Sequence, residues 1–277
     1  MSSNKGLKES PYTSTNIFPT ILKALKAAGK DINNLTIKDL APVDAFHIRG
    51  VEATKELASL IKIKPGYKIL DVGCGIGGTA RYLANNYECF VTGIDITEEY
   101  CKAAAELSNL LNLEDKTEFR HADAIDLPFE NDSFDIVWSE HVQMNIKNKH
   151  KLYREIYRVL KPGGKLIFYD VFKGKGEEIY YPVPWADNPS TDFLVEQNET
   201  KILIESFDFK INYWEDKTDL STNWFSETVT KMKNRNPSPL GLHLVMGKNA
   251  DEKFQNMVRN LNERNITVAQ AIVGKKL

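Results

Sequence analysis

At the junction between a short apolar run, 68–72, and a helical pattern, the chain reads Asp71-Val72-Gly73-Cys74-Gly75-Ile76-Gly77-Gly78. Glycines permit a tight turn and let the backbone approach a ligand closely at the N-terminus of a helix. Gly73, Gly75 and Gly78 also fit the pattern G-x-G-x-x-G, so the glycines alone leave a nicotinamide or flavin dinucleotide open as the ligand. The loop therefore predicts a nucleotide-binding strand–helix unit.

The acid at the start of this loop chooses between the possible ligands. A carboxylate at Asp71 would repel a pyrophosphate, whereas S-adenosylmethionine carries an ammonium and a sulfonium and no phosphate. Asp71 therefore favours S-adenosylmethionine as the cofactor, with Gly73, Cys74, Gly75 and Gly77 forming the turn around it.

The middle of the chain alternates apolar runs with helical patterns. The runs predict parallel strands at 68–72, 89–94, 117–121, 134–138 and 165–169. The segments between them predict helices at 79–87, 97–112 and 147–160, and Lys161-Pro-Gly-Gly164 is expected to end the last helix. This alternation predicts right-handed crossovers and a doubly wound α/β fold.

Polar residues follow three further strands. Asp95 and Ile96 follow the second run, and an acid there would accept hydrogen bonds from ribose hydroxyls. Asp123 and Ala124 follow the third run, where Asp123 could accept from an adenine amino group or could cap the next turn. Glu140 and His141 follow the fourth run, beside the point where open α/β sheets bind ligands.

The two flanks differ from the centre. Helices are expected at 17–28 and 51–63, joined by a Pro-containing connection around Leu40-Ala-Pro-Val-Asp44. After the fifth strand we expect a helix at 191–206, a strand at 207–214, a helical insertion over 217–263 and a last strand at 266–273. We expect one domain over 1–277, made of a helical cap (1–65), a cofactor-binding core (66–172) and acceptor-side segments (173–277).

Four stretches of the core resemble the successive motifs of class I S-adenosylmethionine-dependent methyltransferases: 69–78, 91–95, His121-Ala-Asp-Ala-Ile-Asp-Leu-Pro-Phe129 and Arg158-Val-Leu-Lys-Pro-Gly-Gly164. The resemblance implies a mostly parallel seven-stranded sheet in the order 3-2-1-4-5-7-6. It also implies Asp71 and Gly73 to Gly77 near the methionyl part, Asp95 on the ribose and Asp123 near the adenine. The wider pattern, with Phe46-His-Ile-Arg-Gly50 and His141-Val-Gln-Met-Asn-Ile146, is similar to the small-molecule branch that contains sarcosine/dimethylglycine N-methyltransferases.

The acceptor side is predicted from polar and aromatic residues near the expected cleft. An alcohol or ammonium acceptor needs a base, for which His141 is the candidate and Glu140 the alternative. His47 and Arg49 precede the sheet, where His47 could contact the substrate and Arg49 could bind an acceptor carboxylate. Aromatic residues that could form the far wall, and hold an alkylated ammonium by cation–π attraction, are Tyr169, Tyr181, Trp185 and Trp214.

Bulk properties limit the possible partners. With 36 basic and 38 acidic residues, the net charge of −2 gives no reason to expect binding to nucleic acid or anionic lipid. No apolar run approaches the roughly 20 residues that span a bilayer, and the first residues lack a secretion signal, so we expect a cytoplasmic protein. We also expect a monomer or a homodimer. The three cysteines and five histidines lack paired ligand spacing, so no metal site is predicted.

Two acceptor classes remain open. One is a glycine-type amine, methylated on nitrogen, and the other is a sugar, polyketide or isoprenoid, methylated on oxygen or carbon. A dinucleotide-dependent oxidoreductase and a non-catalytic protein that retains the nucleotide fold are the alternatives from other classes.

Overall fold

The structure is a computed structural model that describes residues 16–233, 238–246 and 249–277. Its centre is a seven-stranded sheet in the order β3-β2-β1-β4-β5-β7-β6, in which only β7 runs antiparallel to its neighbours. The strands are β1 (Lys68–Val72), β2 (Phe90–Asp95), β3 (Thr117–His121), β4 (Phe134–Glu140), β5 (Leu160–Lys173), β6 (Phe209–Asp216) and β7 (Ile266–Lys275). The predicted fold class and strand order are confirmed.

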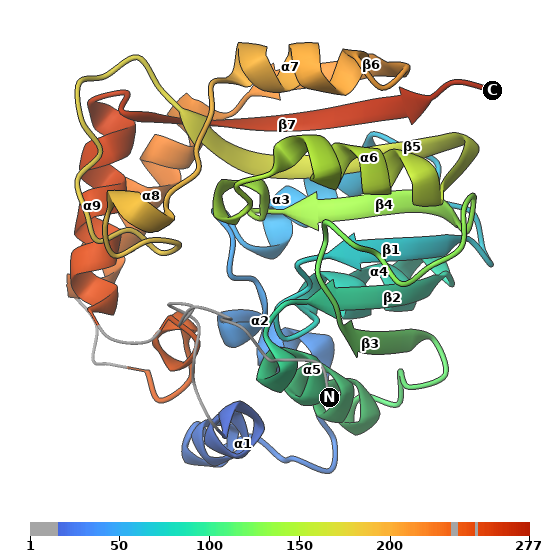
Figure 1. Cartoon of the computed structure of the whole chain (residues 1–277). Coiled ribbons are helices and arrows are strands. Elements are labelled where there is room, and N and C mark those ends of the chain that lie inside the picture. Colours follow the sequence, from blue (N-terminus) through green and yellow to red (C-terminus); the bar gives the residue numbers. More distant parts are fainter. Residues whose placement is uncertain (1–15, 234–237, 247–248) are drawn as a thin grey trace, which may run out of the picture.

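Helices cover both faces of this sheet (Figure 1). On one face, a core cluster joins the sheet to α3 (Val51–Ser59), α4 (Gly78–Tyr87), α8 (Thr218–Lys233) and α9 (Ala250–Asn262). On the other face, a second cluster joins it to α6 (Lys149–Val159) and α7 (Gln197–Glu205). Each face of a parallel sheet must be covered in this way, because its strands are apolar on both sides.

A third cluster packs the N-terminal cap beside the β3 edge. It contains apolar side chains of α1 (Ile17–Ala27), α2 (Ile37–Asp44) and α5 (Glu98–Leu110), together with Leu240 and Val245. The short helical turns η1 (Gln143–Asn145), η2 (Pro189–Thr191) and η3 (Leu242–Leu244) complete the described elements. Residues 234–237 and 247–248 of the predicted insertion lie outside the described residues.

The segment around Leu40 to Asp44 is helical, so the prediction of a connection there is wrong. The helix α2 starts because the Asp39 carboxylate accepts from the Thr36 backbone N–H at 2.9 Å, which satisfies a group that a helix start leaves free. Pro42 lies inside α2, where it lacks an N–H to donate, and the helix ends two residues later. A favourable start therefore outweighs the proline in this short helix.

Strand β5 begins earlier than the apolar run predicted. The helix α6 ends at Val159, and β5 starts at Leu160 and includes Lys161 to Gly164. Phe134 pairs with Leu160, and the register shifts before the pairing resumes between Ile136 and Lys165. The glycines therefore form an irregular start of the strand rather than a separate turn.

The parallel strands end on the side of the molecule where α8 and α9 stand, the left-hand side of Figure 1. The loops that follow β1, β2, β3 and β4 therefore converge on this side. In the described part of the chain, no helix has the combined length and apolarity that a bilayer crossing requires.

Candidate functional site

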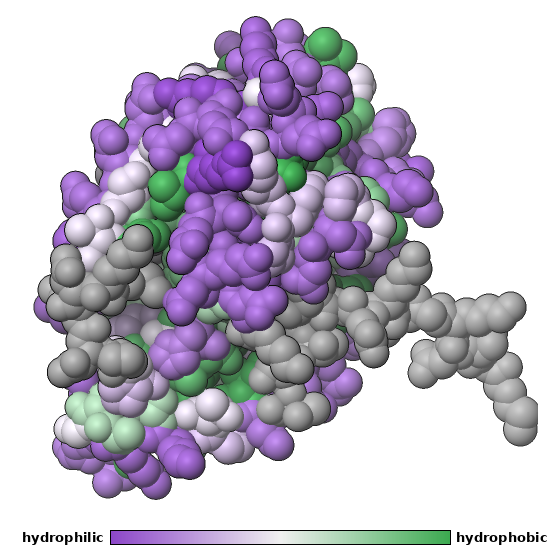
Figure 2. All heavy atoms as spheres, turned by 90° about the vertical axis from the view of Figure 1, so that its left-hand side faces the viewer, coloured by the Kyte–Doolittle hydropathy of each residue, from purple (hydrophilic) through white to green (hydrophobic). Residues whose placement is uncertain are grey.

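A cavity of about 600 Å³ lies at the carboxyl ends of β1, β2, β3 and β4. Figure 2 faces this side of the molecule and shows apolar patches between hydrophilic side chains. The predicted site residues that line the cavity are His47, Asp71, Gly73, Cys74, Gly75, Asp95, Ile96, Asp123, Ala124, Glu140, His141 and Trp185. The volume is in the range of cavities that hold a cofactor or a metabolite.

The glycine loop is held close against its neighbours. The backbone N–H groups of Gly73 and Cys74 both donate to the Ile94 carbonyl, at 2.8 and 2.9 Å. Gly73 has a φ of 71°, and a Cβ at this position would overlap the Val142 side chain. The loop after β1 therefore requires glycine at 73 both for its conformation and for space.

Asp71 is a buried carboxyl group with an unused oxygen. Its side chain lines the cavity, it is 2% exposed, and its Oδ2 has no hydrogen-bond partner among the described residues. Burial raises its pKa well above the usual value, and the charges of Glu140 and Asp95 raise it further. A bound cation would stabilise the charged carboxylate here.

Asp95 fixes the loops on both sides of it. Its Oδ2 accepts from the Gly75 N–H at 3.0 Å, and its Oδ1 accepts from the Thr97 N–H at 2.8 Å. Burial nevertheless raises the pKa of Asp95. Each carboxylate oxygen has further lone pairs, so hydroxyl groups of a ligand can still donate to it.

Asp123 both caps its own turn and lines the cavity. Its Oδ1 accepts a hydrogen bond from the Ile125 N–H at 3.0 Å. This is the bond expected if Asp123 caps the turn that follows β3. The neighbouring Ile96 carbonyl contacts His121 Nε2 at 3.0 Å, which joins the loops after β2 and β3. The two loops thus form one wall.

Glu140 accepts hydrogen bonds from two hydroxyl groups. Thr54 and Thr79 donate to it at 3.0 and 2.6 Å. His47 Nε2 donates to the Gly50 carbonyl at 2.9 Å and lies 3.6 Å from Glu140 Oε1. These contacts connect the N-terminal cap to the end of β4.

Both ring nitrogens of His141 are bonded to the backbone. The Tyr169 carbonyl lies 3.0 Å from Nδ1 and can only accept, so Nδ1 carries the proton. Nε2 is then an acceptor, and the Ile48 N–H donates to it at 3.3 Å. Burial, with a smaller contribution from the nearby His47, lowers the pKa of His141 to about 3, so the ring is neutral.

Gly77, Arg49 and Tyr169 are not among the described residues that line the cavity. Gly77 precedes α4, and a Cβ added at Gly77 would meet the side chains of Phe119 and Arg81. Arg49 Nη2 pairs with Glu56 at 2.5 Å, whereas the buried Nη1 of Arg49 has no hydrogen-bond partner among the described residues. Tyr169 is fully buried beneath His141, and its hydroxyl contacts Ser221 at 3.0 Å.

Tyr181 and Trp214 are also absent from the cavity wall. The Tyr181 hydroxyl donates to Asp192 at 2.6 Å. Trp214 packs against Phe168 and Phe172 in the core cluster of the α6 face, with its indole N–H bonded to Gln197. Of the predicted aromatic wall, only Trp185 lines the cavity.

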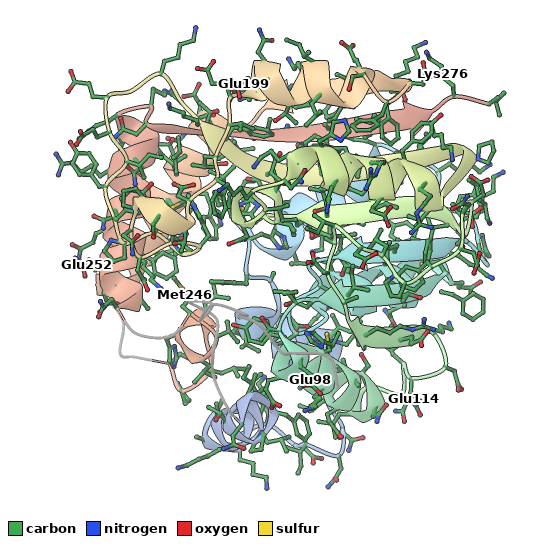
Figure 3. The ribbon with its side chains drawn as sticks, viewed as in Figure 1. Glu98, Glu114, Glu199, Met246, Glu252 and Lys276 are labelled. Carbon is green, nitrogen blue, oxygen red and sulfur yellow. The ribbon has the colours of Figure 1, made fainter. Side chains whose placement is uncertain are left out.

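The sequence analysis missed most of the acceptor-side lining. The apolar residues there come from η1, the segment before α7, α8, η3 and α9: Met144, Phe193, Trp224, Phe225, Leu242, Val245, Met246, Phe254 and Met257. Met246 follows η3 and lies on the side to which the parallel strands point (Figure 3). The spacing of Phe254 and Met257 on one face of a helix was the signal that could have indicated them.

Together, a seven-stranded sheet in this order, a glycine loop after β1 and acids after its neighbouring strands define the class I methyltransferase fold. A family model described as "Methyltransferase domain" matches residues 70–168 of this chain.

Curated relatives match only part of the chain. Phosphoethanolamine N-methyltransferase of Triticum aestivum is 38% identical over 128 residues, which are 46% of this chain and 25% of that protein. Glycine/sarcosine/dimethylglycine N-methyltransferase of Actinopolyspora halophila is 35% identical over 116 residues, 42% of this chain and 20% of that protein. The chain thus spans about a quarter of the length of these relatives.

Solved structures share the fold over nearly the whole chain. Two complexes of phosphoethanolamine N-methyltransferase 2 of Haemonchus contortus match this chain with TM-scores of 0.72 and 0.70. In the complex with S-adenosyl-L-methionine, the two sequences are 21% identical, and the match covers 98% of this chain and 59% of that chain. The [4+2]-cyclase SpnF has a TM-score of 0.69, is 20% identical, and covers 97% of this chain and 98% of that one. The same fold therefore occurs in a protein named for a different reaction.

Proposed function

We propose that this chain is an S-adenosylmethionine-dependent methyltransferase that acts on a small molecule. The observation that carries the proposal is Asp71, a cavity-lining carboxyl group whose Oδ2 is buried without a partner among the described residues. A ligand cation at this point would supply the missing partner, and S-adenosylmethionine carries an ammonium. The family match of residues 70–168 and the complexes of structural neighbours support the same cofactor.

The cavity-lining residues fit this cofactor better than a dinucleotide. Asp71 would hold the ammonium, the backbone of Gly73 to Gly75 would approach the methionyl part, Asp95 would bind ribose hydroxyls and Asp123 the adenine amino group. A pyrophosphate would instead lie beside Asp71, Asp95 and Glu140, which would repel it.

The protein's own contribution to the reaction is positioning and, for some acceptors, proton removal. When bound, the cofactor supplies a methyl group activated by the sulfonium for direct displacement. The cavity walls would align an acceptor with that group, which can account for much of the rate enhancement.

His141 remains the proposed base. The bond from Nδ1 to the Tyr169 carbonyl leaves Nε2 as the proton acceptor, and burial keeps the ring neutral but also makes it a weak base. For His141 to act, the weak 3.3 Å bond from the Ile48 N–H must give way to a bond from the acceptor. Glu140 is a weaker alternative because Thr54 and Thr79 already donate to it.

Relatives support an amine as the acceptor, and the cavity supports a second candidate. The relatives named above are N-methyltransferases of glycine-type amines and of phosphoethanolamine. The apolar residues from α8 and α9 favour an isoprenoid or polyketide, methylated on oxygen or carbon. Three further expectations stay predictions from the sequence: a location in the cytoplasm, a monomer or homodimer, and the lack of a nucleic-acid partner.

The proposal is tested by incubating the purified protein with methyl-labelled S-adenosylmethionine and metabolite extracts. We expect label in an organic acceptor and matching release of S-adenosylhomocysteine, and about 30-fold less of both with Asp71→Asn at a subsaturating cofactor concentration. Cofactor binding without transfer to any acceptor would contradict the proposed activity.

A further inference from the structure

We propose that the methyl acceptor is an uncharged molecule with an aromatic or aliphatic body, an inference that rests on the proposed function. Its body would occupy the acceptor compartment, the part of the cavity lined by Trp185, Phe193, Trp224, Phe225, Phe254 and Met257. This chooses between the two acceptor classes that the sequence left open.

The acceptor compartment has no charged side chain among its described residues. All the lining residues after Asn148 are uncharged, and the only hydroxyl groups among them are those of Ser190 and Thr191. The Phe225 ring contacts the rings of Trp224 and Phe254, with centroids 5.1 and 5.7 Å away. Such a surface gains free energy when it covers apolar groups of a ligand.

An anionic acceptor would find no buried cation in this cavity. In the described part of the chain, no arginine lines the cavity, and the lining lysine, Lys147, is exposed. Desolvating a carboxylate or phosphate without a cation is unfavourable.

The buried cations nearby are engaged elsewhere. Lys149 donates to three backbone carbonyls, those of Gln143, Ile146 and Phe193. Lys253 is buried outside the lining and lies 3.5 Å from Asp187. Neither is available to hold an acid group of glycine or phosphoethanolamine.

One polar group in the compartment can orient an uncharged acceptor. Trp185 is 2% exposed, and its indole N–H has no hydrogen-bond partner among the described residues. Because leaving a buried donor unpaired is unfavourable, an oxygen or nitrogen atom of the acceptor would be its natural partner. Together with the hydroxyl groups of Ser190 and Thr191, this donor gives the compartment a few uncharged polar groups within a mainly apolar surface.

The inference is tested with the neutral apolar fluorophore Nile red, titrated into the protein with and without S-adenosylhomocysteine. We expect saturable binding of one molecule, and displacement by geraniol or phenethyl alcohol but not by glycine or phosphoethanolamine. Absence of saturable binding, or displacement by glycine or phosphoethanolamine, both zwitterions that carry an acid group, would overturn the inference.

Two substitutions on α8 make the test specific. Trp224→Lys places a charge in the compartment and should weaken Nile red binding about tenfold or more. Asn223→Lys places the same charge on the adjacent exposed residue and should leave binding unchanged. Trp224→Gln serves if the lysine variant fails to fold, and unchanged Nile red binding by a folded Trp224 variant would contradict the inference.

The two proposals fail in different ways. The affinity for S-adenosylhomocysteine should be the same in the wild type and both lysine variants, because the carboxylates of the cofactor side are unchanged. If the wild type did not bind S-adenosylhomocysteine, the proposed function would be contradicted. The Nile red titration without cofactor would still measure the affinity of the acceptor compartment for an apolar ligand.

Discussion

Asp71 and Glu140 place two carboxyl groups on one cavity, at the ends of the adjacent parallel strands β1 and β4. Burial first, and the Glu140 charge second, raise the pKa of Asp71. Glu140 receives hydrogen bonds from Thr54 and Thr79, but Asp71 Oδ2 has no partner among the described residues. Asp71 is therefore the point on this wall where a positive charge of a ligand would be most favourable.

Asp71→Asn should weaken cofactor binding without unfolding the protein. The amide keeps the shape but loses the charge that faces the ligand ammonium, so we expect a loss of about 2 kcal/mol, or about 30-fold in affinity for S-adenosylhomocysteine. Calorimetry measures this change. The control is Asp135→Asn, which removes a pair with Lys161 and should leave the affinity unchanged. Equal affinities of wild type and Asp71→Asn would show that the carboxylate does not face the ligand.

Gly73→Ala should destabilise the loop by about 1–3 kcal/mol more than Gly66→Ala. Both glycines have a positive φ, but a Cβ at Gly73 would overlap Val142, whereas a Cβ at Gly66 meets nothing within 4 Å. The difference between their unfolding free energies, from urea denaturation, isolates the overlap. Similar losses for both variants would mean that only backbone conformation matters at Gly73.

Replacing one partner of the Arg81–Asp44 pair should strongly lower the unfolding free energy of the protein. Arg81 is fully buried, and its Nη2 lies 2.5 Å from Asp44 Oδ1, which joins α4 to α2. Arg81→Met leaves a buried charge unpaired and should cost about 3–5 kcal/mol of unfolding free energy.

Two further variants check this explanation. The double variant Arg81→Met, Asp44→Leu should recover much of the loss, because no unpaired charge remains. Lys231→Met, which breaks an exposed pair with Glu227, should cost less than about 0.5 kcal/mol. If Arg81→Met were as mild as Lys231→Met, the pair would not hold the cap to the core.

His141→Gln should change how stability depends on pH. The folded-state pKa of His141 is about 3, below the ordinary 6.5, so its contribution is present above pH 6.5 and is lost as the pH falls. Between about pH 7 and about pH 5, the wild type should lose about 2 kcal/mol relative to the variant. Buried carboxyl groups such as Asp170, whose pKa burial raises to about 8, titrate in both proteins, so only the difference in unfolding free energy is informative. A difference that does not change with pH would show that the pKa of His141 is the same in the folded and unfolded protein.

The sequence allowed the cofactor side to be predicted, because its residues follow consecutive parallel strands. Asp71, Asp95, Asp123 and Glu140 come directly at strand ends, and such ends meet at one edge of a sheet. Local pattern alone was therefore enough to bring them together.

The acceptor side depends on packing between distant segments, which local pattern does not contain. A register shift between Ile211 and Tyr213 places Trp214 against Phe168, on the α6 face and away from the cavity. Phe254 meets Phe225 only because α8 packs against α9. The single-domain division into cap, core and acceptor-side segments stays a prediction.

Calorimetric titration of the wild-type protein with S-adenosylhomocysteine and with a nicotinamide dinucleotide tests the central claim most directly. We predict one S-adenosylhomocysteine molecule bound with micromolar affinity and no binding of the dinucleotide. Below the raised pKa of Asp71, binding should also release a proton, detected as a heat that depends on the buffer, because the ligand ammonium favours the charged carboxylate. Binding of the dinucleotide without binding of S-adenosylhomocysteine would contradict the account.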